Sequence, residues 1–194
     1  MKLYFAPGAC SLADHIALHE AGLEFEHERV DLKAKKTASG ADFAQITAKG
    51  YVPVLILDNG ETLTENVAML DWIAQQGPAL APQGTLGRTR LLEMLAYIST
   101  EIHKSFAPFF QGGSDEEKRK AADKLGKRFG WIASQMKGDF LFGSQPGVAD
   151  CYLFVMLLWA GKNKLAVEPQ LAEFRDRMTQ RPAVQLALTH EGLQ

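Results

Sequence analysis

The chain has 194 residues, of which 46% are hydrophobic, and its 21 basic side chains nearly balance 23 acidic ones. This length is enough for one large core or two small ones, and the charge balance argues against a nucleic acid or an anionic membrane as partner. Two cysteines are too few for a disulfide framework, and the chain opens without the apolar segment of a signal peptide. We therefore expect a cytoplasmic protein with free thiols.

Residues 1–78 alternate between strand and helix patterns. KLYF predicts a strand that ends at Pro7-Gly8, and residues 11–21 predict a helix that ends at Gly22. FEHERVDL alternates like a strand, VPVLILDNGETLT is typical of a hairpin around Asp-Asn-Gly, and a helix pattern fills residues 65–76. The first strand–helix–strand favours parallel pairing and the hairpin adds antiparallel strands, which together predict an α/β domain with a mixed sheet.

Strand patterns are missing from the rest of the chain. GPALAPQGTLG, at residues 77–87, is rich in Pro and Gly and is typical of a linker. Helical patterns follow at 88–111, 115–137, 148–163, 169–180 and 183–190. We expect an α/β domain at 1–78, a linker at 79–87 and an all-helical domain at 88–194.

Cys10 lies where the first helix is expected to begin. Ser11 and Asp14 have the spacing of a capping box, and unpaired amides at a helix N-terminus favour a thiolate. The sequence therefore predicts a Cys10 pKa below the roughly 8.5 of a free thiol, the alternative being a small apolar filler. Ala13 occupies the position three residues after Cys10, so the chain has no C-x-x-C motif here and dithiol–disulfide exchange within it is excluded. Any redox reaction of Cys10 therefore needs an external thiol.

Three other signals are assigned to structure. His15 and His19 are four residues apart on a helix, but zinc needs three or four ligands and no further one is evident, so we expect no metal. Tyr4 is expected to serve packing. Cys151, in the apolar stretch ADCYLFVMLLW, is expected to be inert core.

Several blocks together resemble one family. MKLYFAPGACSLADHIAL, KGYVPVLILDNGETLTENVAMLDWIA, STEIHKSFAPFF and VADCYLF are similar, in order and spacing, to bacterial glutathione transferases of the beta class, which carry a cysteine at this N-terminal position. The resemblance implies a thioredoxin-like domain with a mixed four-stranded sheet, a helical-bundle domain and a homodimer. It also implies detoxification by conjugation of glutathione, as a substrate and with no cofactor, to hydrophobic electrophiles. Thiol-transferase or disulfide-reductase activity through a Cys10–glutathione mixed disulfide is a further implied activity.

The resemblance places the glutathione thiol at the first helix. Cys10 is the implied catalytic residue, with Ser11 beside it at the start of the helix. Val52 is implied to pair its backbone with the cysteinyl part of glutathione, and Pro53 to follow in the cis form. An ordinary strand residue is the alternative for Val52.

The charged ends of glutathione have their own implied partners. Glu65 is implied to bind the ammonium group and Asn66 the γ-glutamyl carboxylate, with plain helix capping as the alternative. Lys35, or its neighbour Lys36, is implied to pair with the glycyl carboxylate, and a solvated lysine face is the alternative.

The helical domain is implied to complete the site. His103 aligns with a histidine beside the catalytic cysteine, where it would bond the thiol and orient the ligand, unless it is a structural residue. Thr100, Glu101 and Ile102 are implied to contact glutathione, in part across the dimer. A hydrophobic co-substrate pocket is expected from four aromatic residues, for which core packing is the alternative: Phe106, Phe109, Phe110 and Trp159.

The chain departs from its relatives at three points. Ala96 replaces a common Asn, Thr47-Ala48 replaces a common Asn-Pro, and Gly147 stands where relatives start a helix with Ser or Thr. These changes bear on substrate range and affinity, and Gly is a tolerable cap, so we expect the fold to survive. Two rival functions share the scaffold: a glutathione-dependent isomerase or ether-cleaving enzyme, and a non-enzymatic interaction protein.

Overall fold

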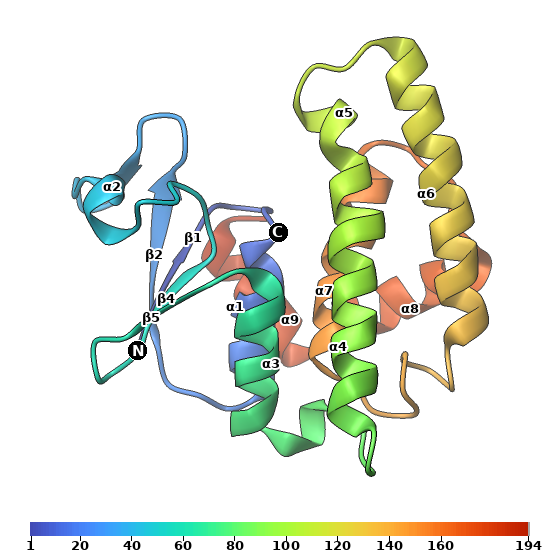
Figure 1. Ribbon diagram of the computed structural model, residues 1–194, viewed down its shortest axis with the longest axis horizontal. Helices are drawn as coiled ribbons and strands as arrows, with labels where there is room; N and C mark the ends of the chain where they lie inside the picture. Colours follow the sequence, from blue (N-terminus) through green and yellow to red (C-terminus); the bar gives the residue numbers. More distant parts are fainter. Residues whose placement is uncertain (194) are drawn as a thin grey trace.

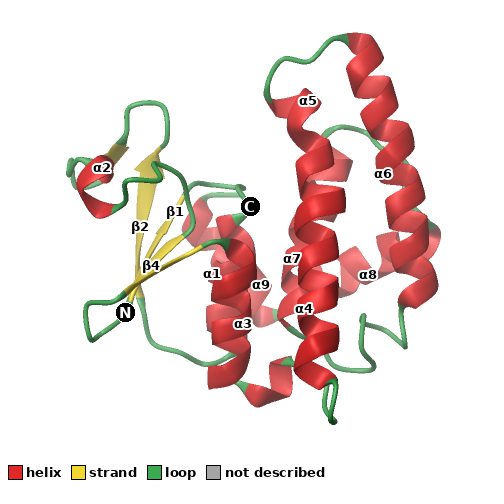
Figure 2. Cartoon of the chain, viewed as in Figure 1, coloured by secondary structure: helices red, strands yellow, loops and turns green. Residues whose placement is uncertain are grey.

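The computed structural model describes residues 1–193 and shows a sheet-containing domain beside a helical one (Figures 1 and 2). The first domain is formed, in chain order, by β1 (Lys2–Phe5), α1 (Ser11–Glu20), β2 (Glu26–Asp31), β3 (Lys36–Thr37), α2 (Phe43–Ile46), β4 (Val54–Ile56), β5 (Thr62–Thr64) and α3 (Asn66–Gln76). This order confirms the predicted strand–helix–strand unit followed by a hairpin and a helix.

The sheet is mixed, as predicted, with the strand order β3-β2-β1-β4-β5. β1 pairs parallel with β2 and antiparallel with β4, and the β4–β5 hairpin turns at residues 57–61. The expected number of four strands is wrong, because β3 adds a fifth through the pairing of Val30 with Thr37. A two-residue strand is too short to show the alternation from which strands are predicted.

The alternation of β1 divides the apolar residues between two clusters. Leu3 and Phe5 face the main core, which continues through α1 and the helical domain. Tyr4 faces the other side and packs with Phe43 and Val52 in a smaller cluster. The opposite directions of successive side chains along a strand explain this division. Tyr4 is 7% exposed, which confirms that it serves packing.

The second domain is all helical. It contains η1 (Pro78–Leu80), α4 (Gly87–Tyr97), η2 (Ile98–Ile102), η3 (His103–Phe106), α5 (Ala107–Phe110), α6 (Asp115–Gln135), α7 (Val148–Lys162), α8 (Pro169–Thr179) and α9 (Pro182–Glu191). The predicted continuous helix at 88–111 is interrupted by a π-helical turn at η2 and a 3-10 turn at η3. Such turns are frequent at functional sites, and this one places His103.

α7 forms the centre of the helical domain. Almost every side chain from Val148 to Leu157 is buried, and Cys151 is wholly enclosed, which confirms that it is core. Burial raises the pKa of the Cys151 thiol well above its usual value. Asp150 accepts hydrogen bonds from the backbone N–H groups of Gly147 (2.8 Å) and Leu141 (2.9 Å), and these bonds fix the start of the helix.

The structure gives a reason for the departure at Gly147. A Cβ atom at this position would lie 2.5 Å from the carbonyl oxygen of Leu80, in the connection between the domains. The close approach leaves no room for the Ser or Thr side chain of the relatives unless the backbone moves.

The last helix returns to the first domain. α9 packs against α1 (Figure 1), and Arg181 forms an ion pair with Glu20. Glu191 accepts a hydrogen bond from the backbone N–H of Gly8 at 2.8 Å. Within residues 1–193, none of the helices is both long enough and apolar enough to cross a membrane.

Candidate active site

Cys10 ends a tight loop between β1 and α1. Gly8 takes a left-handed φ of 67°, and the amide of Ala9 bonds the carbonyl of Ala6 at 3.0 Å, so the chain turns directly into the helix. The predicted capping box is wrong: the Ser11 hydroxyl reaches back to the amide and carbonyl of Ala6, at 3.3 and 3.4 Å. Asp14 is completely buried, and neither carboxyl oxygen has a hydrogen-bond partner within residues 1–193.

The acidity of Cys10 differs from the prediction. Burial, together with the nearby Asp14, raises the pKa of the Cys10 thiol to about 12. The amides of Cys10 and Ser11 at the helix start do lower the pKa, as expected, but their effect is the smaller one. The prediction of a depressed pKa is therefore wrong, and Cys10 is a neutral thiol at pH 7.

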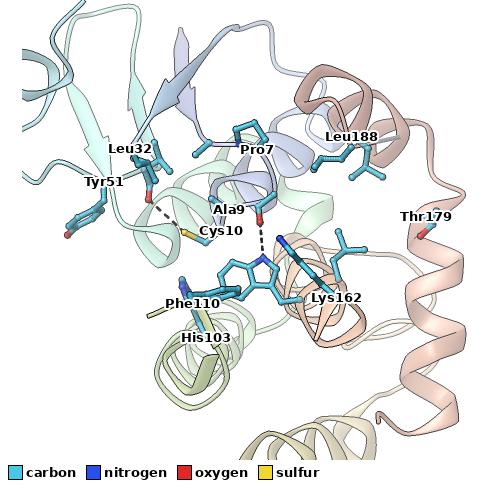
Figure 3. Close-up of a pocket in the computed structure, with 16 residues that line it drawn as sticks. Pro7, Ala9, Cys10, Leu32, Tyr51, His103, Phe110, Lys162, Thr179 and Leu188 are labelled. Atoms are coloured by element: carbon cyan, nitrogen blue, oxygen red, sulfur yellow. Dashed lines mark hydrogen bonds between the residues drawn. The ribbon is translucent and has the colours of Figure 1, made fainter. Parts of the chain in front are cut away.

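A cis peptide bond places a carbonyl group beside this thiol. The Val52–Pro53 bond is cis, as expected from the family resemblance. Both residues are buried, and the Cys10 S–H donates to the Val52 carbonyl oxygen at 3.8 Å (Figure 3). The backbone of Val52 therefore lies directly next to the sulfur atom.

His103 approaches the same space from the helical domain. Its Nδ1 lies 2.6 Å from the Tyr152 hydroxyl oxygen, and its ring meets Trp159 edge to face at 4.9 Å. Burial lowers the pKa of His103 to about 4, so the ring is neutral at pH 7. Burial raises the pKa of Tyr152, while a hydrogen bond from Ser99 opposes this rise. With Ser99 donating to Tyr152 and Tyr152 to Nδ1, the Nε2–H of His103 is left as a donor.

A cavity of about 760 Å³ joins these groups. Figure 3 shows Cys10 above His103 and Phe110, with Lys162 and Leu188 on the side toward α7 and α9. The Trp159 Nε1–H donates to the Gly8 carbonyl at 2.8 Å, so this ring closes one wall by bridging the two domains. The cavity is lined by residues 6–10 and by Leu32, Tyr51, Val52, His103, Phe110, Leu158, Trp159, Lys162, Thr179, Leu188 and Leu193.

The four candidate aromatic residues divide into two pairs. Phe110 is 51% exposed and meets Trp159 edge to face at 4.8 Å, and both line the cavity. Phe106 is wholly buried in the main core, and Phe109 packs against that core. The structure therefore brings Phe110 and Trp159 to the cavity and leaves the other pair behind them.

The candidate partners for the charged ends of glutathione lie further out. Glu65 has a left-handed φ of 71° and accepts hydrogen bonds from Lys49 Nζ (2.6 Å) and the Tyr51 hydroxyl (2.7 Å), which lower its pKa. Asn66 is buried, and its Nδ2 donates to the Cys10 carbonyl at 2.8 Å. Lys35 Nζ donates to the Gly50 carbonyl at 2.7 Å on the exposed surface. Asn66 thus links the start of α3 to Cys10 directly.

The other candidates on the helical domain point elsewhere. The Thr100 hydroxyl donates to the Ala96 carbonyl at 3.0 Å, and Ile102 is wholly buried in the core. Glu101 forms an ion pair with Arg128 on α6 at 2.8 Å. None of these three residues lines the cavity described above.

Sequence reasoning missed several residues of the site. Tyr152 is the partner of His103, Lys49 is the partner of Glu65, and Tyr51 and Lys162 line the cavity. Lys49 and Tyr51 come just before the cis Val52–Pro53 bond, so their closeness to Val52 in the sequence could have indicated that they belong to the site. Tyr152, in an apolar helix, carried no local signal of this role.

The glutathione S-transferase N-terminal domain model matches residues 9–76, and the C-terminal domain model matches residues 94–182. The chain therefore belongs to the glutathione S-transferase family. GstA of Escherichia coli O157:H7 is 42% identical over the full length of both chains. The ternary complex of BphK, a bacterial family member, superimposes with a TM-score of 0.93 at 48% identity, and the beta-class enzyme of Sphingomonas chungbukensis with 0.90 at 45%, each covering all of both chains. Within the family the protein is a glutathione transferase of the bacterial beta class.

Proposed function

We propose that the protein joins glutathione to hydrophobic electrophiles in the cavity beneath Cys10. The observation that carries this proposal is one cavity that joins the Cys10 thiol and the Val52 backbone to an apolar wall of Phe110, Trp159 and leucines. A related sphingomonad transferase, 45% identical with a TM-score of 0.90, has been solved in complex with glutathione. A cavity with a polar end and an apolar end suits a reaction between a peptide-like thiol and an apolar partner.

In conjugation the nucleophile is the sulfur of glutathione. The thiolate attacks the electrophilic carbon, a carbon–sulfur bond forms, and the leaving group departs with the bonding electrons. The neutral Cys10 S–H and the amides at the start of α1 are donors that stabilise the thiolate before the attack. The Nε2–H of His103 is a third donor on the opposite wall. Cys10 thus acts as a hydrogen-bond donor in this reaction.

The glutathione backbone extends from Val52 toward the start of α3. Glu65 binds the ammonium group, which replaces Lys49 Nζ as its partner. Asn66 and the amides at the start of α3 bind the γ-glutamyl carboxylate. Lys35 pairs with the glycyl carboxylate from the exposed side. Glu65 and Lys35 are already charged and exposed at the rim, so they exchange partners with little desolvation.

A second activity is thiol transfer through Cys10. Its thiolate attacks one sulfur of a glutathione disulfide, a Cys10–glutathione bond forms, and glutathione thiolate leaves. The supporting observation is that Cys10 borders the cavity, whereas Cys151 is completely buried. Because the pKa of Cys10 is raised to about 12, this reaction is slow at neutral pH.

We also propose a homodimer formed through the α4 and α6 face. Trp131 on α6 is 40% exposed and packs against Tyr97 of α4 at 4.2 Å. Glu101 lies on the same face, turned away from the cavity of its own chain, which suits a role across an interface. Light scattering at micromolar concentration should give twice the mass of one chain, and a monomer mass would contradict the dimer.

Retention on immobilised glutathione, followed by an electrophile panel, tests the proposed function. We expect retention, and turnover of an activated aryl chloride or an epoxide to a thioether. Maleylacetoacetate isomerase of Pseudomonas aeruginosa is 28% identical over 96% of this chain, so the panel includes a cis-configured diketo acid. If the protein isomerises that acid and forms no thioether with any substrate, its activity is isomerisation and not conjugation. Retention with no turnover of any substrate would contradict the proposal.

A further inference from the structure

Four of the five histidines of the chain gather outside the Cys10 cavity. His15 and His19 come from α1, His27 from β2 and His190 from α9. The ring of His190 stacks on His27 with 4.3 Å between centroids, and the centroids of His15 and His190 are 5.5 Å apart. The fold thus brings together side chains from three elements that are distant in the sequence.

The ring nitrogens converge on one point. Three ring nitrogens lie within 4.8 Å of one another, one from each of His15, His27 and His190. Among them, Nε2 of His15 is 3.3 Å from Nδ1 of His190. A tetrahedral zinc ion, with bonds of about 2.0–2.1 Å, holds its nitrogen ligands about 3.4 Å apart. This pair therefore already has the spacing of two ligands. His27 and His190 are thus candidate ligands beside His15 that the sequence did not make evident.

A buried carboxylate orients the innermost histidine. Nδ1 of His15 lies 3.1 Å from Oε1 of Glu191, and both side chains are 0% exposed. When Nδ1–H donates to Glu191, the lone pair of Nε2 points at the other two rings, which is the usual arrangement behind a metal-binding histidine. The other oxygen of Glu191 accepts from the Gly8 amide at 2.8 Å. A metal ion on Nε2 would favour the form in which Nδ1–H donates to Glu191.

The remaining surroundings leave room for an ion to enter. His27 is exposed and His190 is half-buried, so two of the three residues are in part accessible to solvent. The fourth histidine, His19, stacks on His15 with 5.3 Å between centroids, and its Nε2 is enclosed without a hydrogen-bond partner within residues 1–193. The cluster therefore includes one ring nitrogen, Nε2 of His19, that no group within residues 1–193 satisfies.

We propose that His15, His27 and His190 form a binding site for a divalent transition-metal ion that prefers imidazole ligands, such as zinc. Three histidines leave a fourth position for water. The ion would fasten α9 to α1 and β2, and so join the last helix to the first domain. Neutral imidazole is the form that binds such an ion.

Zinc titration by calorimetry tests the site. The protein is used without an affinity tag and without glutathione, and the Cys10→Ser variant is the background, because thiols bind zinc as well. We expect one zinc ion per chain. His27→Asn should weaken zinc binding at least about tenfold, and because His27 is exposed the variant should keep the fold, which circular dichroism checks.

His103→Asn is the matched control, since it changes the one histidine outside the cluster. It should bind zinc like the Cys10→Ser background, and zinc should raise the melting temperature of this control but not of His27→Asn. Equal affinity in the background and in His27→Asn would overturn the proposal. So would a failure of the Cys10→Ser protein to bind zinc at micromolar concentrations.

Discussion

The thiol end of the cavity, formed by Cys10 and His103, differs from its exposed rim, formed by Lys35, Lys49 and Glu65. At the thiol end, burial holds both groups neutral: it raises the pKa of Cys10 to about 12 and lowers that of His103 to about 4. At the rim, the side chains are exposed to water and stay charged. Hydrogen bonds from Lys49 and Tyr51 lower the pKa of Glu65. One site thus combines a desolvated end with a solvated one.

The difference assigns different work to the two ends. Desolvated donors act strongly on a charge that develops beside them, so the thiol end should govern the chemical step. Exposed ion pairs contribute little each and are screened by salt, so the rim should govern recognition of glutathione with smaller effects. Variants at the two ends should therefore separate kcat from affinity.

The largest effect is expected at Cys10 itself. Cys10→Ala should abolish the glutathione adduct that glutathione disulfide forms, while Cys151→Ala should keep it. Because the pKa of Cys10 is raised to about 12, the rate of adduct formation should rise about tenfold per pH unit between pH 7 and 10. Intact mass and peptide mapping follow the adduct. A rate that levels off near pH 7 would show that the thiol end is not desolvated.

His103 is expected to have the next largest effect. His103→Ala should lower kcat for conjugation about 100-fold, because a donor at the sulfur is lost. Tyr152→Phe removes only the hydroxyl that orients His103 and should lower kcat about tenfold, with KM for glutathione unchanged. Steady-state kinetics measure both. If KM for glutathione rises in both variants by as much as kcat falls, His103 acts in glutathione binding instead.

The neutral state of His103 also predicts a loss of stability in acid. The unfolded chain takes up a proton near pH 6.5, whereas the folded His103 does so only near pH 4. Its contribution to stability is therefore complete above pH 6.5 and falls as the pH decreases, by about 2 kcal/mol at pH 5. Urea unfolding of the wild type and His103→Gln should show this slope in the wild type and a smaller slope in the variant. Parallel curves would contradict the prediction.

The smallest effects are expected at the rim. Glu65→Ala should weaken glutathione binding about tenfold, since a charged partner of the ammonium group is lost. Lys35→Ala should weaken it less than about threefold, because exposed pairs are worth little. Lys49→Ala is the control, and by freeing Glu65 it should leave affinity equal or higher. Calorimetry in which Lys35→Ala exceeds Glu65→Ala would reverse the two roles.

The sequence predicted the features that local pattern controls. The Asp-Asn-Gly hairpin, the helix that starts after Cys10 and the apolar α7 follow from turn residues and periodicity, and the structure has them. The resemblance added the cis bond before Pro53, which no local pattern predicts. Strand β3 escaped prediction because its two residues, Lys36–Thr37, are too few to show the alternation of a strand.

The candidate site was predictable in its residues and less so in its electrostatics. The helix start at Cys10 was correctly placed, but the pKa of its thiol depends on how much chain covers it and on Asp14, whose carboxyl oxygens have no hydrogen-bond partner within residues 1–193. Burial of this kind is set by contacts between distant segments. The same reason hid the approach of His190 to His15, 175 positions earlier in the chain.

The bond between Glu191 and the Gly8 amide joins groups 183 positions apart, and its consequence concerns the order of synthesis. A ribosome makes Gly8 183 residues before Glu191. During synthesis the loop that carries Cys10 therefore forms without this bond, and it gains the bond only after α9 has been translated and has packed against α1.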